Sequence, residues 1–284
     1  MPLNSVNTNM GATVALQSLN ATNSALQMTQ KHISTGFRVS DATDDGAAYA
    51  VAQRVRSDVN ALTSANQQLG NIQGLLSTTN TALNNLSNTM SSARNVLVKL
   101  ADSNTQGSQR AQYIAQYKSL TDNMKTFFRD ASYSGKTLVG NIGGASGFGR
   151  VAVVRNEVAA TYGIATYSGS AFMASISFTT TQLNGVTTVA GLIGTASSAT
   201  FINQLDKLGT AMANYGAAFT YVANQISYNS DKMDALNNGL GALIDADLAK
   251  ESAKLQSLQI RQQLGTQSLS IANQAPQSLL SLFK

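Results

Sequence analysis

Few residues of this chain could support catalysis, and they stand far apart. His32 is the single histidine, and it lies beside Lys31 in a polar stretch. A Ser-His-Asp triad would have to use this histidine, but no Gly-x-Ser-x-Gly elbow accompanies it. We therefore expect His32 to be a solvated surface residue. The sequence gives no positive support for an enzyme, and we assign no catalytic residue.

Two acidic pairs could be taken for metal ligands, namely Asp44-Asp45 and Asp245-x-Asp247. Neither pair has a third ligand cluster near it in the sequence. Acidic residues at the start of a helix instead accept hydrogen bonds from free backbone N–H groups and complement the helix dipole. The chain has no cysteine, so disulfides and Cys-ligated metals are excluded. We expect this helix-start role for the acidic pairs, with no metal and no cofactor.

The sequence also shows no clear binding site for phosphate or nucleic acid. The glycines that loosely resemble a phosphate loop precede no Lys-Ser/Thr pair and lack a strand–helix context, so turns between strands explain them better; they are Gly143, Gly144, Gly147 and Gly149. The net charge is +5, but the basic residues are scattered rather than gathered in a stripe with interleaved aromatic residues. We therefore expect no nucleic-acid partner.

The two ends of the chain are patterned as helices yet carry almost no charge. No Asp, Glu, Lys or Arg occurs within residues 1–30 or 262–283, and charged residues are only 12% of the chain. Apolar and small polar residues recur at steps of three and four, which is typical of the seam of a packed helix. The seam positions are Leu16, Leu19, Asn23, Leu26, Gln30, Ile33 and Phe37 near the start, and Leu248, Glu251, Leu255, Leu258, Gln262, Gly265, Leu269, Ala272, Pro276, Leu279 and Phe283 near the end.

Uncharged ends indicate burial, because solvated helices normally carry charge and the centres of protein interfaces are depleted in it. A single chain rarely buries both of its ends, so we expect copies of the same protein to cover them. The uncharged C-terminal run is interrupted by glutamines, an asparagine and Pro276, which argues against a transmembrane helix. The N-terminus has no cationic and apolar regions of a secretory signal.

The regions between the ends alternate between helix and a Gly/Ser/Thr-rich middle. The apolar pattern predicts one helix of about fifty residues up to Leu100, roughly 75 Å long. A break at residues 102–108 precedes a second helix, which ends at the turn Ser134-Gly135. Short β-branched runs at residues 150–155 and 174–180 predict β-hairpins. From Phe201 the pattern returns to a helix with a 3.5-residue average period, which favours supercoiling.

These elements predict a mainly α fold, in which the N- and C-terminal arms form a long antiparallel helical bundle or coiled coil around a small β-hairpin-rich middle segment. Residues 1–41 would pair with residues 245–284 as inner helices. Residues 42–138 and 201–244 would form the two halves of the bundle, and residues 139–200 would form the β-rich segment at its distal tip.

Short distinctive motifs occur near both ends of the chain. Residues 34–39 read Ser-Thr-Gly-Phe-Arg-Val, and residues 44–48 read Asp-Asp-Gly-Ala-Ala. These motifs resemble Leu-Ser-Thr-Gly-x-Arg-Ile and Asp-Asp-Ala-Ala-Gly of the bacterial flagellin family. Residues 244–251 resemble the family's Ile-x-Asp-Ala-Asp-x-Ala-x-Glu, and residues 272–280 resemble its closing Ala-Asn-Gln-x-Pro-Gln-x-x-Leu. The motifs occur in the family's order and cover both helical arms.

The resemblance implies a subunit that polymerises into the extracellular flagellar filament used for motility. It implies export through the flagellar type III apparatus with a chaperone that binds the C-terminus, and contacts with hook-associated junction and cap proteins. The inner tube would be built from Val6, Met10, Leu16, Leu19, Leu26, Ile33, Leu258, Leu269, Ile271, Leu279 and Phe283. The joint between inner and outer tube, with its axial contacts, would involve Ser34, Thr35, Gly36, Arg38, Asp44, Asp45, Asp245 and Asp247.

The resemblance also bears on recognition by the vertebrate innate receptor Toll-like receptor 5. Flagellins that this receptor detects present Arg-Val-Arg-Glu-Leu on the long helix. The aligned positions here include Ser92, Arg94, Asn95 and Val96, so the first Arg, the Glu and the Leu of that motif are missing. We expect recognition to be weak.

Two other functions remain open from the sequence. One is a hook–filament junction protein of the same superfamily, which would be made in few copies. The other is a monomeric extracellular helical binding module, which would have no need for uncharged ends.

Overall fold

Helices dominate the structure, a computed structural model that describes residues 9–142, 148–194 and 200–281, with side chains described as far as residue 274. The described parts contain α1 (Met10–Thr35), α2 (Gly46–Leu100), α3 (Gly107–Asp130), β1 (Val151–Val154), β2 (Thr161–Ile164), α4 (Gly169–Ile176), α5 (Thr180–Asn184), α6 (Val186–Ile193), α7 (Phe201–Ile244) and α8 (Leu248–Ser281). The mainly α fold with a small β segment is confirmed, as are the predicted long helix and its break.

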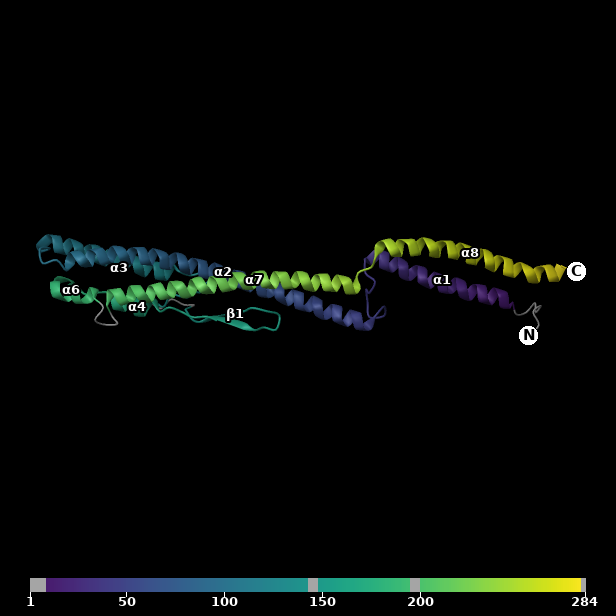
Figure 1. Cartoon of the computed structure of the whole chain (residues 1–284), viewed down its shortest axis with the longest axis horizontal. Coiled ribbons are helices and arrows are strands. Elements are labelled where there is room, and N and C mark those ends of the chain that lie inside the picture. The colour runs from purple at the N-terminus through teal and green to yellow at the C-terminus, as the bar shows by residue number, and fades with distance from the viewer. Residues whose placement is uncertain (1–8, 143–147, 195–199, 282–284) are drawn as a thin grey trace. The chain divides into compact units, whose positions relative to one another are not determined.

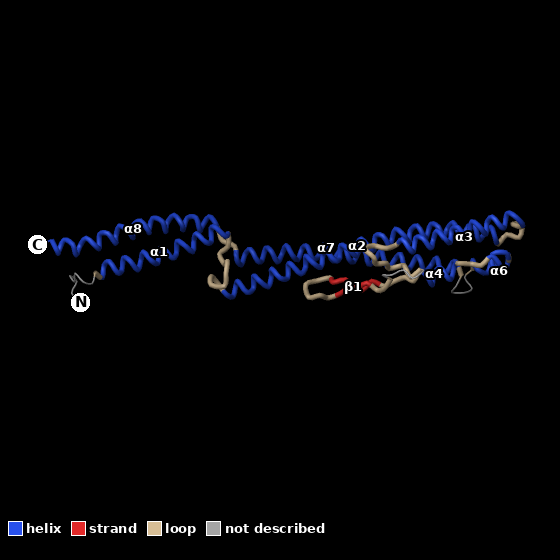
Figure 2. Tube along the Cα trace, turned by 180° about the vertical axis from the view of Figure 1, so that it is seen from behind, coloured by secondary structure: helices blue, strands red, loops and turns tan. Residues whose placement is uncertain are grey.

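The chain divides into two units. The terminal unit comprises residues 1–58 and 234–284, and the central unit comprises residues 59–233. Both ribbon views show α1 running alongside α8 in the terminal unit (Figures 1 and 2). Asn9 caps α1, since its Oδ1 accepts a hydrogen bond from the Ala12 N–H at 3.0 Å. Gly36 ends α1 with φ of 74°, the left-handed conformation that glycine adopts without strain.

The core of the central unit lies among α2, α3, α7 and the short helices that follow the hairpin. Leu69, Leu76, Leu83, Met90 and Leu97 of α2 are buried here. The largest fully buried side chains of this core also include Tyr117, Phe128, Phe172 and Phe201. The Tyr117 hydroxyl donates to the carbonyl oxygen of Ile176 at 2.6 Å, so this buried polar group is satisfied. Burial raises the pKa of Tyr117 well above its usual value.

One β-hairpin was predicted correctly and one was not. Strands β1 and β2 pair antiparallel, with Val151 opposite Ile164 and Val154 opposite Thr161. The prediction of a strand at residues 174–180 was wrong, because this run contains the end of α4 and the start of α5. Phe172 and Ile176 lie one helical turn apart and are both buried, and Thr179 forms a capping box with Gln182 that begins α5.

A buried asparagine fastens the hairpin to the helices of the central unit. The Asn229 side chain is fully buried, and its Nδ2 donates to Asn66 Oδ1 at 2.8 Å and to the Arg155 carbonyl oxygen at 2.9 Å. Gln225 Nε2 donates to Asn229 Oδ1 at 2.9 Å. The Tyr162 ring also stacks on Tyr221 with 4.1 Å between centroids. The hairpin is therefore held by both polar and aromatic contacts.

Replacing Asn229 by leucine is expected to destabilise the central unit by about 2 kcal/mol, because buried polar partners lose their hydrogen bonds. The hairpin should also detach more readily, so trypsin should cleave after Arg155 faster than in the unmodified protein. Urea unfolding and timed proteolysis measure the two effects. Asn224→Leu, at an exposed position of the same helix, is the matched control. Equal urea midpoints for the two variants would contradict this role of Asn229.

Candidate functional site

The joint after α1 brings together residues that lie some two hundred positions apart. The Arg38 N–H and Val39 N–H both donate to the Ile244 carbonyl oxygen, at 2.7 and 3.2 Å, and the Ala246 N–H donates to the Gly36 carbonyl oxygen at 2.9 Å. Phe37 and Asp245 form an isolated antiparallel bridge. The chain that leaves α1 is thus paired with the chain that enters α8. Of the predicted joint residues, this pairing unites Gly36, Arg38 and Asp245.

Asp44 organises the loop between α1 and α2. Lys31 Nζ lies 2.9 Å from Asp44 Oδ2 and 2.5 Å from Asp41 Oδ2. The Ser40 N–H and hydroxyl both donate to Asp44 Oδ2 at 3.0 Å. The hydrogen bond from Lys31 lowers the pKa of Asp41 to about 2 and lowers that of Asp44 further still, while the two carboxylates raise the pKa of Lys31.

This cluster is expected to make the loop sensitive to acid. In the folded protein the pKa values of both carboxyls lie below 3.8, the ordinary value of an aspartate. Their stabilising contribution is therefore present above about pH 4; the part from Asp41 is lost as pH falls through about 2, and the part from Asp44 is lost at still lower pH. Hydrogen exchange of the Ser40 amide, which donates to Asp44, measures the loss when it is followed from pH 6 to below pH 2. Asp44→Asn should exchange fast across the whole range, and an unchanged pH profile in that variant would contradict the assignment.

Other predicted joint residues act on the helix ends. Asp45 Oδ1 accepts from the Ala48 N–H at 3.0 Å at the start of α2, and Asp247 Oδ1 accepts from the Ala249 N–H at 3.0 Å at the start of α8. The helix-start role predicted for the acidic pairs is confirmed for these two residues. Ser34 and Thr35 donate their hydroxyl protons back to the Lys31 carbonyl oxygen in the last turn of α1. Among the described residues, no three His, Cys, Asp or Glu side chains gather as a metal site would require.

The prediction that His32 is solvated was wrong. Its side chain is buried, with 7% of the residue exposed, and Nδ1 lies 3.5 Å from Glu251 Oε1 on α8. Thr29, one turn earlier on α1, is also buried. Polar neighbours in the sequence suggested solvent, but the face of the helix decides burial, and His32 lies on the face that packs against α8.

The predicted inner-tube residues fall into separate groups. Some lie in the seam between α1 and α8, where they are buried or half-buried: Leu19, Leu26, Ile33, Leu258 and Leu269. Met10, Leu16 and Ile271 are instead exposed. Val6 and Phe283 lie outside the described residues, and Leu279 lies in the last part of α8, beyond the described side chains. The prediction thus combined an internal seam with a second, outward surface.

Of the exposed predicted residues, Ile271 belongs to a second apolar seam that runs along the two helices, which we name the outer seam. On α1 it comprises Val14, Ala21 and Met28, and on α8 it comprises Ile260, Leu264 and Ile271. The large members are exposed: Val14 by 61%, Met28 by 53%, Ile260 by 57%, Leu264 by 62% and Ile271 by 59%. Sequence reasoning named only Ile271 among the outer-seam residues. The spacing of four and seven residues between the members of this seam was a signal that could have found the others.

The segment aligned with the innate-receptor motif lies on α2. Ser92, Arg94 and Asn95 are exposed, whereas Val96 is buried with 3% of its surface accessible. Only three of the four aligned positions could therefore contact a partner in this conformation.

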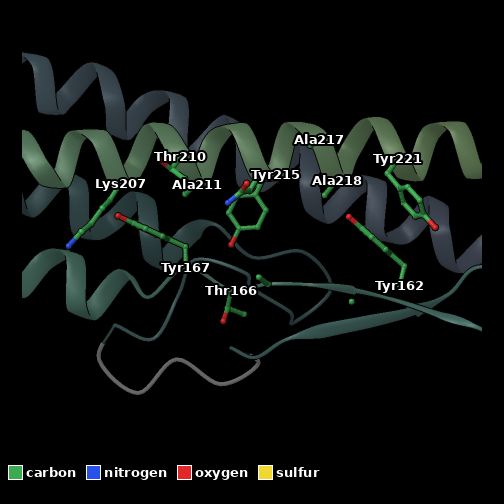
Figure 3. Close-up of a pocket in the computed structure, with 13 residues that line it drawn as sticks. Tyr162, Thr166, Tyr167, Lys207, Thr210, Ala211, Tyr215, Ala217, Ala218 and Tyr221 are labelled. Carbon is green, nitrogen blue, oxygen red and sulfur yellow. The ribbon is translucent and has the colours of Figure 1, made fainter.

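The central unit also holds a cavity of about 700 Å³ between α7 and the segment from β2 to Tyr167. Its lining includes Tyr215 and Tyr221 of α7 together with Tyr162 and Tyr167, all labelled in Figure 3, and the rings of Tyr162 and Tyr221 stack on each other. The Tyr215 hydroxyl donates to the Leu138 carbonyl oxygen at 3.1 Å, and burial raises the pKa of Tyr167 to about 12. The described residues that line the cavity include no carboxylate and no imidazole.

Comparisons with known proteins agree with this architecture of paired terminal helices. Residues 6–143 match the bacterial flagellin N-terminal helical region, and residues 200–283 match the bacterial flagellin C-terminal helical region. The chain is 32% identical to flagellin FljM of Caulobacter vibrioides over 288 residues, which cover all of both chains. It is also 32% identical to a flagellin of Brucella melitensis over 294 residues, which cover 99% of each chain.

Two solved structures were also compared. The crystal structure of Bacillus cereus flagellin shares 14% identity with a TM-score of 0.48, covering 57% of this chain and 88% of that chain. The structure of a putative flagellar hook-associated protein from Vibrio parahaemolyticus shares 14% identity with a TM-score of 0.40, covering 77% of this chain and 98% of that chain.

A helical protein whose two ends pair and present uncharged apolar seams belongs to the class of self-assembling structural subunits. The two family regions span most of this chain, and the chain therefore belongs to the bacterial flagellin family. Its function is that of a structural subunit of the flagellar filament, as the resemblance at both ends implied. No helix in the described ranges combines the length and apolar character that a membrane crossing needs.

Proposed function

We propose that this chain polymerises into a helical homopolymer through the outer seam of α1 and α8, with the seam between the two helices reserved for contacts within one chain. The observation that carries the proposal is the exposure of large apolar side chains along heptad-spaced lines on both helices. A lone soluble protein rarely leaves such a stripe open. The absence of charge over residues 1–30 and 262–283 suits burial by neighbouring copies.

The joint would transmit contacts along the filament axis. Arg38 and Asp245 are exposed beside the paired segment, and Ser34, Thr35, Asp45 and Asp247 are exposed at the adjoining helix ends. Side chains placed there can meet a copy stacked above or below. Contacts between different surfaces of successive copies do not close into a ring when a translation accompanies the rotation, and they then build a helical filament.

The partners beyond the filament follow from the family. The chain would pass through the flagellar type III apparatus with a chaperone bound to its C-terminus, and would meet hook-associated junction and cap proteins outside the cell. The lack of cysteine and the presence of only two prolines suit transit as an unfolded chain. The family is structural, and we propose no catalytic activity.

Recognition by Toll-like receptor 5 would be weak. Of the aligned residues, Arg94 supplies the one cation, and Val96 is buried where an exposed partner contact would be needed. The missing acidic residue removes a charge-assisted contact that a receptor surface could use.

Seeded growth tests the proposal. The full chain is mixed with short filament fragments and imaged by electron microscopy, beside a version that lacks residues 1–30 and 262–284. We expect the full chain to elongate the seeds and the truncated chain to remain monomeric. A full chain that stays monomeric on compatible seeds would favour the junction protein or the binding module instead.

A further inference from the structure

Polar side chains interrupt the seam between α1 and α8, and they meet one another across it. Gln262 Nε2 donates to Asn23 Oδ1 at 2.8 Å. Two and a half turns further along α1, His32 Nδ1 lies 3.5 Å from Glu251 Oε1. Between the amide pair and the chain ends, Gly265 lies against Leu19, and a Cβ placed on Gly265 would be 3.8 Å from the Leu19 Cβ.

These contacts all belong to one antiparallel register. The step from Leu19 to His32 along α1 is thirteen residues, and the step from Gly265 back to Glu251 along α8 is fourteen, so the two helices advance together. Asn23 and Gln262 fall between these two points in the same alignment.

The apolar residues alone would permit other registers. Leu19, Leu26 and Ile33 recur every seven residues on α1, and Leu255 and Leu269 recur on α8 with Gln262 midway between them. The native register places Leu26 opposite Leu258, and a slip of seven residues would place Leu19 or Ile33 there instead, so that an apolar residue meets Leu258 again. The same slip would place Asn23 opposite Leu269 or Leu255, where its amide would have no partner.

We propose that the Asn23–Gln262 amide pair, assisted by the His32–Glu251 contact, determines the register in which the two terminal helices of one chain pair. Both amides are half-buried, and an amide left unpaired there adds a cost to the slipped states that the recurring apolar contacts do not remove. The register in turn sets where the outer seam of α8 lies relative to that of α1, since a seven-residue slip moves one helix by about 10 Å along the other.

Disulfide competition tests this proposal in the full-length chain, which has no cysteine of its own. The triple variant Leu19→Cys/Leu26→Cys/Gly265→Cys gives the thiol at position 265 two possible partners. The native register brings position 19 to the disulfide Cβ–Cβ distance of about 3.8 Å, while position 26 becomes the partner only after a slip of seven residues. Equilibration in glutathione buffer followed by peptide mapping gives the ratio of the two disulfides.

The ratio is compared among four backgrounds, with helix content checked by circular dichroism. With the amide pair intact, we expect the 19–265 disulfide to dominate. Asn23→Leu/Gln262→Leu should lower the ratio of the 19–265 to the 26–265 disulfide by about tenfold or more, because the slipped register no longer leaves an amide without a hydrogen-bond partner. The exchange Asn23→Gln/Gln262→Asn keeps an amide pair and should largely restore the ratio. Asn20→Leu/Gln263→Leu, at exposed positions of the same helices, should leave it unchanged.

The measurement is made on the free chain and on sedimented filaments. An equal ratio in the leucine pair and in the exposed control would overturn the proposal, and so would the absence of the 19–265 disulfide from both samples. The disulfides form within one chain, so their ratio can be measured even if the variants do not polymerise. A failure to polymerise would therefore count against the proposed outer-seam interface and not against the proposed role of the amide pair.

Discussion

Lysine at Leu264 and Ile271 is expected to stop filament growth while the central unit stays folded. Both side chains are exposed on the outer seam of α8, so their replacement should change the free energy of unfolding by no more than about 0.5 kcal/mol. In a polymer the two ammonium groups would be buried without partners, at a cost of about 3 kcal/mol or more. Elongation of seeds should therefore fall by more than about a hundredfold.

Light scattering of seeded growth, with electron microscopy of the products, measures this effect. The matched control is Gln259→Lys/Gln263→Lys, which adds the same charge to exposed polar positions of α8 outside both seams. We expect this control to elongate seeds. Normal elongation by Leu264→Lys/Ile271→Lys would contradict the outer-seam interface, and equal inhibition by both variants would show that added charge alone blocks assembly.

The long helices could be predicted because their burial follows the sequence period closely. In α2, Leu69, Leu76, Leu83, Met90 and Leu97 recur every seven residues, and all are buried. A pattern repeated over many turns outweighs local exceptions such as Gly70 in the same helix. The positions of the helix ends were also visible, since the Asn/Ser/Gly-rich break after Leu100 separates α2 from α3.

The short elements of the middle could not be predicted in the same way. Alternating Ser and Ile at residues 174–177 fits a strand as well as a helix, and the run is too short for the period to decide. What decides is tertiary contact, because Ile176 is fully buried and its carbonyl oxygen receives the Tyr117 hydroxyl. That contact joins residues 59 positions apart, so no local sequence pattern can predict it.

In the candidate site, too, some features follow from the sequence period and others depend on tertiary contacts. Seam residues such as Leu26 and Leu258 were recognisable from spacing, and the family motifs marked the joint. The burial of His32 and the Lys31–Asp44 contact depend on which turn of α1 meets α8 and on how the following loop folds back. Periodicity identifies an apolar face, but it does not say whether that face meets its own chain or another copy.

The packing of α4 against the core gives the second large effect. Gly169 is buried, and its N–H donates to the Gly140 carbonyl oxygen at 3.1 Å. A Cβ added there would lie 2.6 Å from the Val139 carbonyl oxygen and 2.9 Å from Phe128 Cδ1. Gly169→Ala must therefore push α4 away from backbone that has little freedom to move. We expect the central unit to lose about 3 kcal/mol of stability.

Urea unfolding of the full chain, followed by tyrosine fluorescence, tests this expectation. The control is Gly70→Ala, an exposed glycine of α2 whose added Cβ would meet nothing within 4 Å. This control should raise stability by about 1 kcal/mol, because alanine favours helix over glycine. Both substitutions add one methyl group. If Gly169→Ala lowers the free energy of unfolding and Gly70→Ala raises it, the loss at position 169 comes from close packing of α4 and not from helix propensity. A Gly169→Ala midpoint at or above that of the unmodified chain would show that α4 can shift without breaking the Tyr117–Ile176 contact.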